Sequence, residues 1–534
     1  MSRRPSVAAN GRGLRIAILA LLALGQGMAA GCMTFATRRV FSAMREGDPN
    51  LPIFPIGLIC LGGLVLATCH LAESALAERV GQEYAAAVRS ALFRHMSESA
   101  VHRNVDNRLG SMSLRFVGDL AALKGWITSG MARLISAAIT IPTGLLALYL
   151  LEPALGLAST VPILLGISLI WWTGGPLKQA HWQLRMRRSR LAADLTERLP
   201  MAAALRQLGR HRIEQRNLKT LSRALTHAAT HRALTVGLLR AIPDISGVVA
   251  TASVLAVAIR ASDASTADAA AALTGLALIM RPMRQLVGIW DRRQAWEVAS
   301  ERLDRVLATP RLLGRTRPST ASVGGQAEGP MLAIRNLRLS SGDTLTTHLQ
   351  AGIWARLVGP AGSGKSYLLL MVAGLEPSPS HAVRVRGMRP VNTPPGEVLY
   401  LGPFSPMLKG SIRRNILMGA TTPPSDEDLE SLARRAGLGT ALDRLGGLSA
   451  PVKERAVNLS HAERASLLVT RAIVADPRLL LVDADEIGLE GTQVRLLAEA
   501  LKSRGCAAVI ASRSESAKEC CDIEVHLKGV ANND

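Results

Sequence analysis

The segment Gly359–Ser366 has the residue types and the spacing of a phosphate-binding loop, with the sequence GPAGSGKS. Its glycines would let consecutive backbone N–H groups curl around a phosphate, and the helix that follows would add the positive end of its dipole. Lys365 would reach the outer phosphates, and the Ser366 hydroxyl would ligate Mg²⁺. The predicted contact residues for ATP and Mg²⁺ in this segment are Gly359, Pro360, Ala361, Gly362, Ser363, Gly364, Lys365, Ser366 and Tyr367.

The sequence on both sides of this loop has the pattern that such a loop requires. The stretch ARLV precedes it and predicts a β-strand, and the apolar stretch YLLLMVAGL follows it and predicts a helix. A strand, a glycine-rich turn and a helix in this order are typical of P-loop proteins. We therefore expect an α/β nucleotide-binding domain with a P-loop fold over residues 331–534.

The stretch 479–490, LLLVDADEIGLE, predicts a buried strand that delivers one carboxylate to a metal ion. Nucleotide-hydrolysing proteins with such a strand usually place a second carboxylate, the catalytic base, directly after the first. In one register Asp483 holds Mg²⁺ and Ala484 stands at the position of the base. In the other, Asp485 holds Mg²⁺ and Glu486 is the base. The second register would leave Asp483 as an unpaired charge in a buried strand, which is costly, so we favour the first.

The composition indicates a membrane protein rather than a nucleic-acid-binding one. Of the 534 residues, 48% are hydrophobic and only 19% are charged, and the mean hydropathy is +0.21. The net charge of +22 is uneven, since residues 1–330 carry 39 Lys/Arg against 20 Asp/Glu and residues 331–534 carry 24 against 21. Basic residues concentrated between apolar segments follow the positive-inside pattern of membrane proteins. We therefore expect contact with a lipid bilayer and no binding of nucleic acid.

Six apolar segments are long enough to span a bilayer, which takes about 20 residues. They are residues 14–37, 52–72, 127–151, 154–174, 238–260 and 264–286. Residues 178–223 carry twelve Lys/Arg against three acids, which predicts that this segment and the N-terminus are cytoplasmic. Arg38, Arg39 and Arg45 go against this rule in the loop after the first span.

Two arginines, Arg281 and Arg284, lie inside the sixth predicted span. One interpretation is that they reach to the cytoplasmic interface or line the inner mouth of the domain. The other is that they face a substrate cavity, because charged residues in spans usually face polar space. At a separation of three residues they share one face of a helix. In a cavity they would favour an anionic substrate, or an amphipathic one with an acidic head.

Four further stretches resemble the ABC transporter family in its exporter form. The stretch VKERAVNLSHAERASLLVTRAIVADPRLLLVD resembles the family's signature region, and GSIRRNILMG is similar to the segment after its Q-loop. The stretch RLGSMSLRFVGDL resembles the cytoplasmic part before the third span, and ASERLDRVLATP resembles the end of the sixth helix. The resemblance implies a six-helix, all-α transmembrane domain over 1–308, a linker over 309–330 and an ABC-type α/β ATP-binding domain over 331–534.

The family's spacing also favours the first register. The distance from Ser460 of the signature to Asp483 is 23 residues, and the distance from Asp483 to Glu490, at the D-loop aspartate position, is seven. The resemblance implies that Ser460 contacts nucleotide and that Ser366 and Asp483 hold Mg²⁺.

Several positions depart from the family pattern. Pro403 aligns with the Q-loop glutamine and Ser512 with the switch histidine, and the two signature glycines are His461 and Ala462. Leu339–Ser341 offers no aromatic residue to stack on adenine. The phosphate cradle is retained while most of the hydrolytic residues are replaced, so we assign no catalytic residue and leave open whether the chain hydrolyses ATP.

The resemblance implies an ATP-binding permease subunit that couples ATP binding or hydrolysis to export of an unidentified substrate. Its own nucleotide site would be weakly hydrolytic or non-hydrolytic. It would form a dimer with a second half-transporter, and a heterodimer with an intact partner is favoured. The expected location is the bacterial inner membrane, with several spans and a cytoplasmic ATP-binding domain. The alternative is an ATP-binding pseudo-ATPase that acts as a regulatory or assembly subunit.

Overall fold

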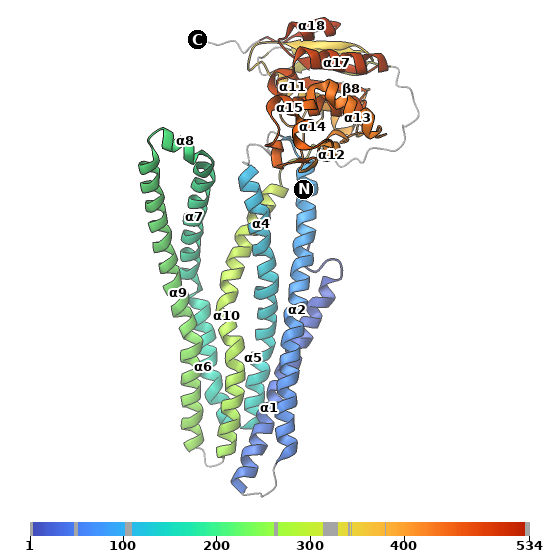
Figure 1. Cartoon of the computed structure of the whole chain (residues 1–534). Coiled ribbons are helices and arrows are strands. Elements are labelled where there is room, and N and C mark those ends of the chain that lie inside the picture. Colours follow the sequence, from blue (N-terminus) through green and yellow to red (C-terminus); the bar gives the residue numbers. More distant parts are fainter. Residues whose placement is uncertain are drawn as a thin grey trace. The chain divides into compact units, whose positions relative to one another are not determined.

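The computed structural model describes residues 4–46, 52–101, 109–260, 265–312, 329–339, 342, 344–379 and 381–528. The chain divides into two compact units, one formed by Met1–His95 and Arg108–Thr309 and the other by Met96–Asn107 and Pro310–Asp534. The first unit is helical and the second is α/β (Figure 1), which confirms the predicted fold class. The exact domain bounds stay predictions, and most of the predicted linker lies outside the described residues.

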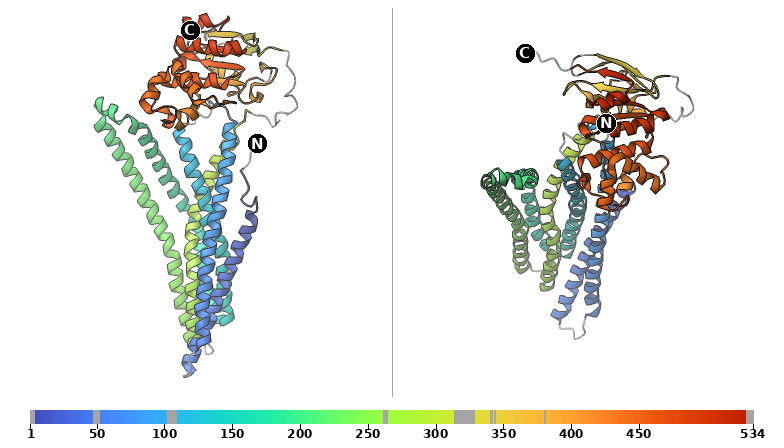
Figure 2. Two further views of the ribbon diagram at one scale, coloured as in Figure 1. Left: turned by 45° about the vertical axis from the view of Figure 1, so that its right-hand side comes forward. Right: turned by 45° about the horizontal axis from the view of Figure 1, so that its top comes forward.

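Eight long helices and one short helix, α8, are described in the first unit. They are α1 (Arg12–Glu46), α2 (Ile53–Ser97), α4 (Leu109–Trp126), α5 (Ala132–Leu151), α6 (Pro153–Trp172), α7 (Gly174–Arg198), α8 (Ala202–Gln207), α9 (His211–Arg260) and α10 (Thr266–Leu307), with a π-helical turn at Ile127–Met131 and a 3₁₀ turn at Leu199–Met201. Both views in Figure 2 show α7 and α9, joined at α8, diverging from α4 and α10. Buried side chains of α5, α6, α9 and α10 form the apolar core of this unit.

Among the described residues, five helical segments are long and apolar enough to cross a membrane. They are Arg12–Glu46, Ile53–Ser97, Gly118–Leu151, Pro153–Trp172 and His211–Arg260. The first five predicted spans fall on these five segments, with ends that differ by one or two residues at 52–72 and 154–174. The sixth predicted span lies in α10, which is not among the five because Asp268, Arg281 and Arg284 interrupt its apolar sequence. The sixth span therefore stays a prediction.

One of the arginines that go against the positive-inside rule has a specific partner. Arg38 of α1 lies with its Nε 2.5 Å from Oδ1 of Asp268, a buried acid in the first turn of α10. The capping box that Asp268 forms with Ser265 also orients this carboxylate. The prediction that Arg38, Arg39 and Arg45 lie in a loop is wrong, because α1 extends to Glu46, and the pairing with Asp268 offsets the charge of Arg38.

A buried carboxylate joins three helices of the first unit. Glu73 of α2 accepts a hydrogen bond from Nε2 of Gln26 in α1 at 2.6 Å, and Oγ of Ser136 in α5 lies 3.4 Å from the same oxygen. All three side chains are buried. A polar group buried between helices costs free energy unless it is hydrogen-bonded, so this cluster selects one packing of α1 against α2 and α5.

We expect Gln26→Leu to lower the free energy of unfolding by about 1–2 kcal/mol, because it leaves the Glu73 carboxylate without its amide donor. Unfolding of the detergent-solubilised chain, followed by circular dichroism, measures this change. The matched control is Thr68→Val on α2, since Thr68 is exposed and bonds only its own helix backbone. Equal losses in the two variants would contradict a role for the buried cluster.

The second unit is built on a five-stranded parallel sheet in the order β10-β3-β9-β8-β5. These strands are β3 (Trp354–Val358), β5 (Val398–Leu401), β8 (Leu479–Asp483), β9 (Ala507–Ala511) and β10 (Ile523–His526). An antiparallel sheet in the order β2-β1-β4 comprises β1 (Leu332–Arg338), β2 (Thr344–Leu349) and β4 (Val383–Val385), and a short ribbon pairs β6 (Gly410–Ser411) with β7 (Pro451–Val452).

Helices of the second unit pack on the parallel sheet or beside it. The helices are α11 (Lys365–Val372), α12 (Ile412–Ile416), α13 (Asp426–Ala433), α14 (Gly439–Leu445), α15 (His461–Ala475), α16 (Ala484–Ile487), α17 (Gly491–Leu501) and α18 (Glu515–Cys520), with short 3₁₀ or π turns at Pro390–Asn392, Arg434–Leu438, Glu454–Ala456 and Lys502–Arg504. Of these, α12, α13 and α14 form a separate apolar cluster with α15. Alternate residues of β8 enter two cores, one with α11 and one with α15 and α17. The strand is therefore apolar throughout, as central parallel strands are.

Candidate nucleotide site

The parallel sheet brings the predicted site residues to one edge. The loop Gly359–Gly364 follows β3, and Asp483 is the last residue of β8. Ser512 directly follows β9, and Pro403 is the second residue after β5. Because parallel strands end at the same side of a sheet, these four positions lie along its carboxyl edge. In open α/β sheets this edge is where ligands bind.

The loop between β3 and α11 has the backbone that its glycines permit. Gly362 and Gly364 have φ of +79° and +88°, in the left-handed region that favours glycine. A Cβ on Gly359 would come within 2.7 Å of the Leu527 carbonyl oxygen, so no side chain fits there. The Lys365 ammonium donates to the carbonyl oxygens of Gly359 and Pro360, at 2.8 and 2.9 Å. The lysine is thus held against the loop that would surround a phosphate.

Asp483 and Ser366 meet behind this loop, although 116 residues separate them in the sequence. Asp483 is only 2% exposed, and Ser366 lies close enough to it to influence its pKa. Burial raises the pKa of Asp483, and the nearby Ser366 hydroxyl and the Lys365 charge oppose this rise. A hydroxyl and a carboxylate are oxygen ligands of the kind that Mg²⁺ prefers.

Two buried oxygens of this site are unpaired, which is the arrangement that residues holding a nucleotide with its metal would have. Oγ of Ser363 and Oδ2 of Asp483 are buried and have no hydrogen-bond partner among the described residues. Most buried polar atoms in proteins are paired, so such atoms indicate a ligand, ion or water. When bound, Mg²⁺ would neutralise phosphate charge, with Ser366 and Asp483 on its side and Lys365 on the outer phosphates.

The two carboxylates of the alternative register lie outside this buried site. Asp485 and Glu486 belong to α16 and are exposed, and Asp485 accepts a hydrogen bond from the Arg513 backbone N–H at 3.1 Å. Ala484 is 2% exposed and directly follows Asp483. This placement favours the first register, while the metal and base positions themselves stay predictions.

Ser512 and Pro403 have few side-chain groups that can form hydrogen bonds. Ser512 is buried, and its hydroxyl accepts a hydrogen bond from the Ser514 backbone N–H at 3.1 Å. Pro403 is exposed and has no side-chain donor or acceptor. That these two positions lack the water-positioning groups of the family pattern stays a prediction.

The signature residues form the start of α15. Ser460 is its N-cap and accepts a hydrogen bond from the Glu463 N–H at 3.2 Å, while Glu463 accepts one from the Ser460 N–H at 2.7 Å. His461 is exposed, and its ring lies against Gly488, where a Cβ would come within 2.8 Å of it. Its side chain therefore packs on the segment after β8.

The sequence analysis missed Tyr400 on β5. Its hydroxyl is buried with no hydrogen-bond partner among the described residues, and burial together with the charges of Asp483 and Glu486 raises the pKa of Tyr400. A Cβ on Gly402 would come within 2.0 Å of this hydroxyl, so the phenol occupies the space that Gly402 leaves. The position of this tyrosine near the carboxyl end of a predicted strand could have indicated from the sequence that it lies near the site.

Comparison with known families matches both units. The family model described as ABC transporter transmembrane region matches residues 16–283, and the one described as ABC transporter matches residues 343–485. The first alone covers half of the chain.

Individual relatives cover the chain in part. The ABC transporter ATP-binding protein RamB of Streptomyces coelicolor is 32% identical over 38% of this chain and 32% of its own length. A multidrug efflux ATP-binding/permease protein of Mycobacterium tuberculosis is 25% identical over 77% of this chain and 35% of its own length. The type I secretion system ATP-binding protein PrsD of Rhizobium meliloti is 28% identical over 52% of this chain and 49% of its own length. The chain thus spans between a third and a half of the length of these relatives.

A solved structure shares the fold over nearly the whole chain. It is a bacterial Atm1-family ABC exporter with ATP bound, which superposes with a TM-score of 0.79 over 97% of this chain and 94% of its own, at 18% sequence identity. The solved structure shows that this chain shares the fold of such an exporter, and the two family matches show that the chain belongs to the ABC transporter family.

Proposed function

We propose that the chain is an exporter subunit whose own nucleotide site binds ATP with Mg²⁺ but hydrolyses it weakly or not at all. The observation that carries this proposal is the buried Ala484 directly after Asp483, where the family's catalytic base would stand. The retained loop around Lys365, with the unpaired oxygens of Ser363 and Asp483, supports binding. Two relatives named for multidrug efflux and type I secretion support export.

The expected loss of hydrolysis is large. A general base contributes about 10²–10⁴ in rate, or about 3–5 kcal/mol of barrier. Pro403 and Ser512 stand where the other two water-positioning groups would be, and neither can replace them. Groups that act as a unit are not additive, so the three replacements need not multiply, but little remains that could rescue turnover.

We further propose a heterodimer. In this family two nucleotide domains enclose each ATP between one chain's P-loop and the other chain's signature, so a homodimer would lack a base at both sites. Leu199, Met201 and Leu208 flank the turn at α8 and are 66%, 58% and 72% exposed. Exposed apolar side chains on a part that diverges from its own bundle support burial against a second chain. The proposed location is the bacterial inner membrane, with the basic segment 178–223 and the nucleotide domain in the cytoplasm.

One observation favours the alternative, a pseudo-ATPase that regulates or assembles a membrane complex. His461 and Ala462 replace the paired glycines of the signature, and the His461 ring is packed against Gly488. Side chains at these positions would crowd a phosphate bound from the partner, so this chain would also impair its partner's site.

ATPase measurements on the purified chain test the proposal. We expect the chain alone to turn over ATP at least about 100-fold more slowly than its complex with a half-transporter from an adjoining gene that has an intact base. The control is the same complex with the partner's base replaced by glutamine, which should be as slow as the chain alone. Robust hydrolysis by the chain alone would overturn the proposal, and a complex that is equally inactive would favour the pseudo-ATPase.

A further inference from the structure

A pocket in the helical unit is lined by five arginines from three helices. Its volume is about 360 Å³, and the arginines are Arg133 of α5, Arg232 and Arg240 of α9, and Arg281 and Arg284 of α10. Their positions in the sequence span more than 150 residues, so only the packing of α5, α9 and α10 brings the guanidinium groups to one cavity.

Two of these arginines are neutralised within the unit. Nε of Arg284 donates to Oδ1 of Asp244 at 2.8 Å, and Nη2 of Arg232 donates to Oδ2 of Asp291 at 2.8 Å. Across the part of the chain that the structure describes, Arg133, Arg240 and Arg281 have no ion-pair partner. The pocket therefore has an excess of three positive charges.

The position of these three arginines makes a bound anion the favoured partner. Arg133, Arg240 and Arg281 lie within the third, fifth and sixth predicted spans. An unpaired guanidinium that faced lipid there would be expensive, so charges in such segments face polar space and pair with charged groups. Guanidinium groups bind carboxylate and phosphate groups through paired hydrogen bonds, which suits this pocket to the negative end of a ligand.

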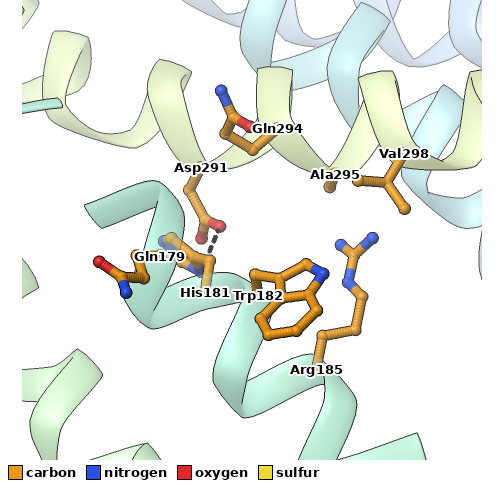
Figure 3. A pocket seen from close by; sticks show the side chains of 8 residues that line it. All are labelled: Gln179, His181, Trp182, Arg185, Asp291, Gln294, Ala295 and Val298. Carbon is orange, nitrogen blue, oxygen red and sulfur yellow. Dashed lines mark ion pairs between the residues drawn. The ribbon is translucent and has the colours of Figure 1, made fainter. Parts of the chain in front are cut away.

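A second pocket adjoins the first and is mostly apolar. It has a volume of about 320 Å³ and lies between α7 and α10, with Trp182, Ala295 and Val298 along its wall. Figure 3 shows the Trp182 ring and the Arg185 side chain on α7 facing Ala295 and Val298 on α10, beside the contact of His181 Nδ1 with Asp291 Oδ1 at 3.0 Å. The indole of Trp182 is 58% exposed, which leaves a large apolar surface for contact.

The two pockets meet at one network of side chains. Asp291 lines both pockets, and Arg232 of the first contacts Nδ1 of His181 in the second at 2.8 Å as well as Asp291. A ligand with a negative group at one end and an apolar body at the other could therefore occupy both.

We infer that these adjoining pockets form one binding site for an amphipathic organic anion. The carboxylate or phosphate group binds the arginines of the first pocket, and the apolar body lies against Trp182 in the second. The inference adds to the proposed export function the chemical class of the substrate. Binding of the anion does not depend on that function, but transport of the anion does. The same chemistry belongs to a free amphipathic acid and to an anionic lipid headgroup with its chain.

Equilibrium binding to the full chain in phosphatidylcholine nanodiscs, without nucleotide, tests the inference. The probe is dansyl-undecanoic acid, with its uncharged methyl ester as the matched ligand and empty nanodiscs as background. We expect saturable binding of the acid, weakened about tenfold or more by the double variant Arg240→Gln/Arg281→Gln. Arg212→Gln/Arg216→Gln makes the same charge change on exposed residues of α9 away from both pockets, and should change the affinity by less than about twofold.

Two further variants and one change of lipid test the separate parts of the inference. Arg281→Lys keeps the charge and should retain most of the binding, which separates loss of charge from misfolding. Trp182→Ala should weaken binding of the acid several-fold. Exchange of phosphatidylcholine for phosphatidylglycerol should remove acid binding if an anionic lipid occupies the site and leave it intact if the site takes a free acid, and either result supports the assigned ligand class.

Acid and ester that bind equally well would overturn the inference, as would a double variant that binds the acid like wild type. Unchanged affinity in Trp182→Ala would remove the apolar half of the site and with it the assignment of an amphipathic ligand. Because no nucleotide is present, none of these failures bears on hydrolysis, and robust ATP hydrolysis by the chain alone would leave the anion site standing.

Discussion

Lys365→Ala is expected to abolish binding of ATP with Mg²⁺, which the unaltered chain should bind in the micromolar-to-millimolar range. The ammonium lies against the carbonyls of Gly359 and Pro360, on the loop that would surround the phosphates. Hydrogen bonds to charged groups contribute about 1.5–3 kcal/mol each. If Lys365 donates two such bonds to the phosphates, their loss corresponds to about 100-fold or more in affinity for ATP. Equilibrium dialysis with radiolabelled ATP measures this change.

The matched control for this prediction is Lys518→Ala, which removes an exposed lysine of α18 and should leave the affinity unchanged. Product analysis of the same samples should show that the bound ATP stays intact. An affinity in Lys365→Ala that equals that of the unaltered chain would mean that the loop does not bind phosphate. Substantial release of ADP by the unaltered chain would mean that Ala484 is not the position of the base.

Restoration of hydrolysis should require several substitutions together. Ala484→Glu returns a carboxylate beside Asp483, yet Pro403 and Ser512 still offer no side chain that positions the attacking water. We therefore expect little gain from Ala484→Glu alone, and a gain of about 10²–10⁴ in turnover from the triple variant Ala484→Glu/Pro403→Gln/Ser512→His. Steady-state ATPase assays on the purified variants measure both.

Glu486→Gln provides the internal control for this series. Glu486 is exposed on α16, so its substitution should leave the turnover of the triple variant unchanged. If Glu486→Gln instead removed an activity that the unaltered chain has, Asp485 and Glu486 would be the metal ligand and the base, and the register favoured above would be wrong.

The phosphate-binding loop could be predicted from the sequence because its chemistry is contiguous. Residues 359–366 supply the glycines, the lysine and the hydroxyl from one turn, so their spacing alone specifies what they can surround. The apolar spans of the first unit could be predicted because each is one contiguous segment, whose length the thickness of the bilayer sets. The fold class followed from these local patterns, and the structure and the family matches confirm it.

Part of the nucleotide site also followed from a general rule of topology. Asp483 meets Ser366 because parallel strands end at one edge of their sheet, which a strand-by-strand interpretation of the sequence can anticipate. The same rule does not tell how a side chain fills the space between strands. The Tyr400 hydroxyl over Gly402 was missed for this reason, because its burial depends on the contact between β5 and its neighbours.

The sequence by itself determined the loop, the apolar spans and the two arginines of the sixth span. Arg133 and Arg240 are also charged residues inside predicted spans, as Arg281 is. Their spacing in the sequence does not show that they share a cavity. The tertiary structure decided that, together with the pairing of Arg38 with Asp268 and of Arg232 with Asp291. The physical reason is the separation in sequence of the groups that interact. The binding groups of the loop are neighbours in the chain, whereas a charge between helices is stabilised by distant residues that the packing brings within a few ångströms.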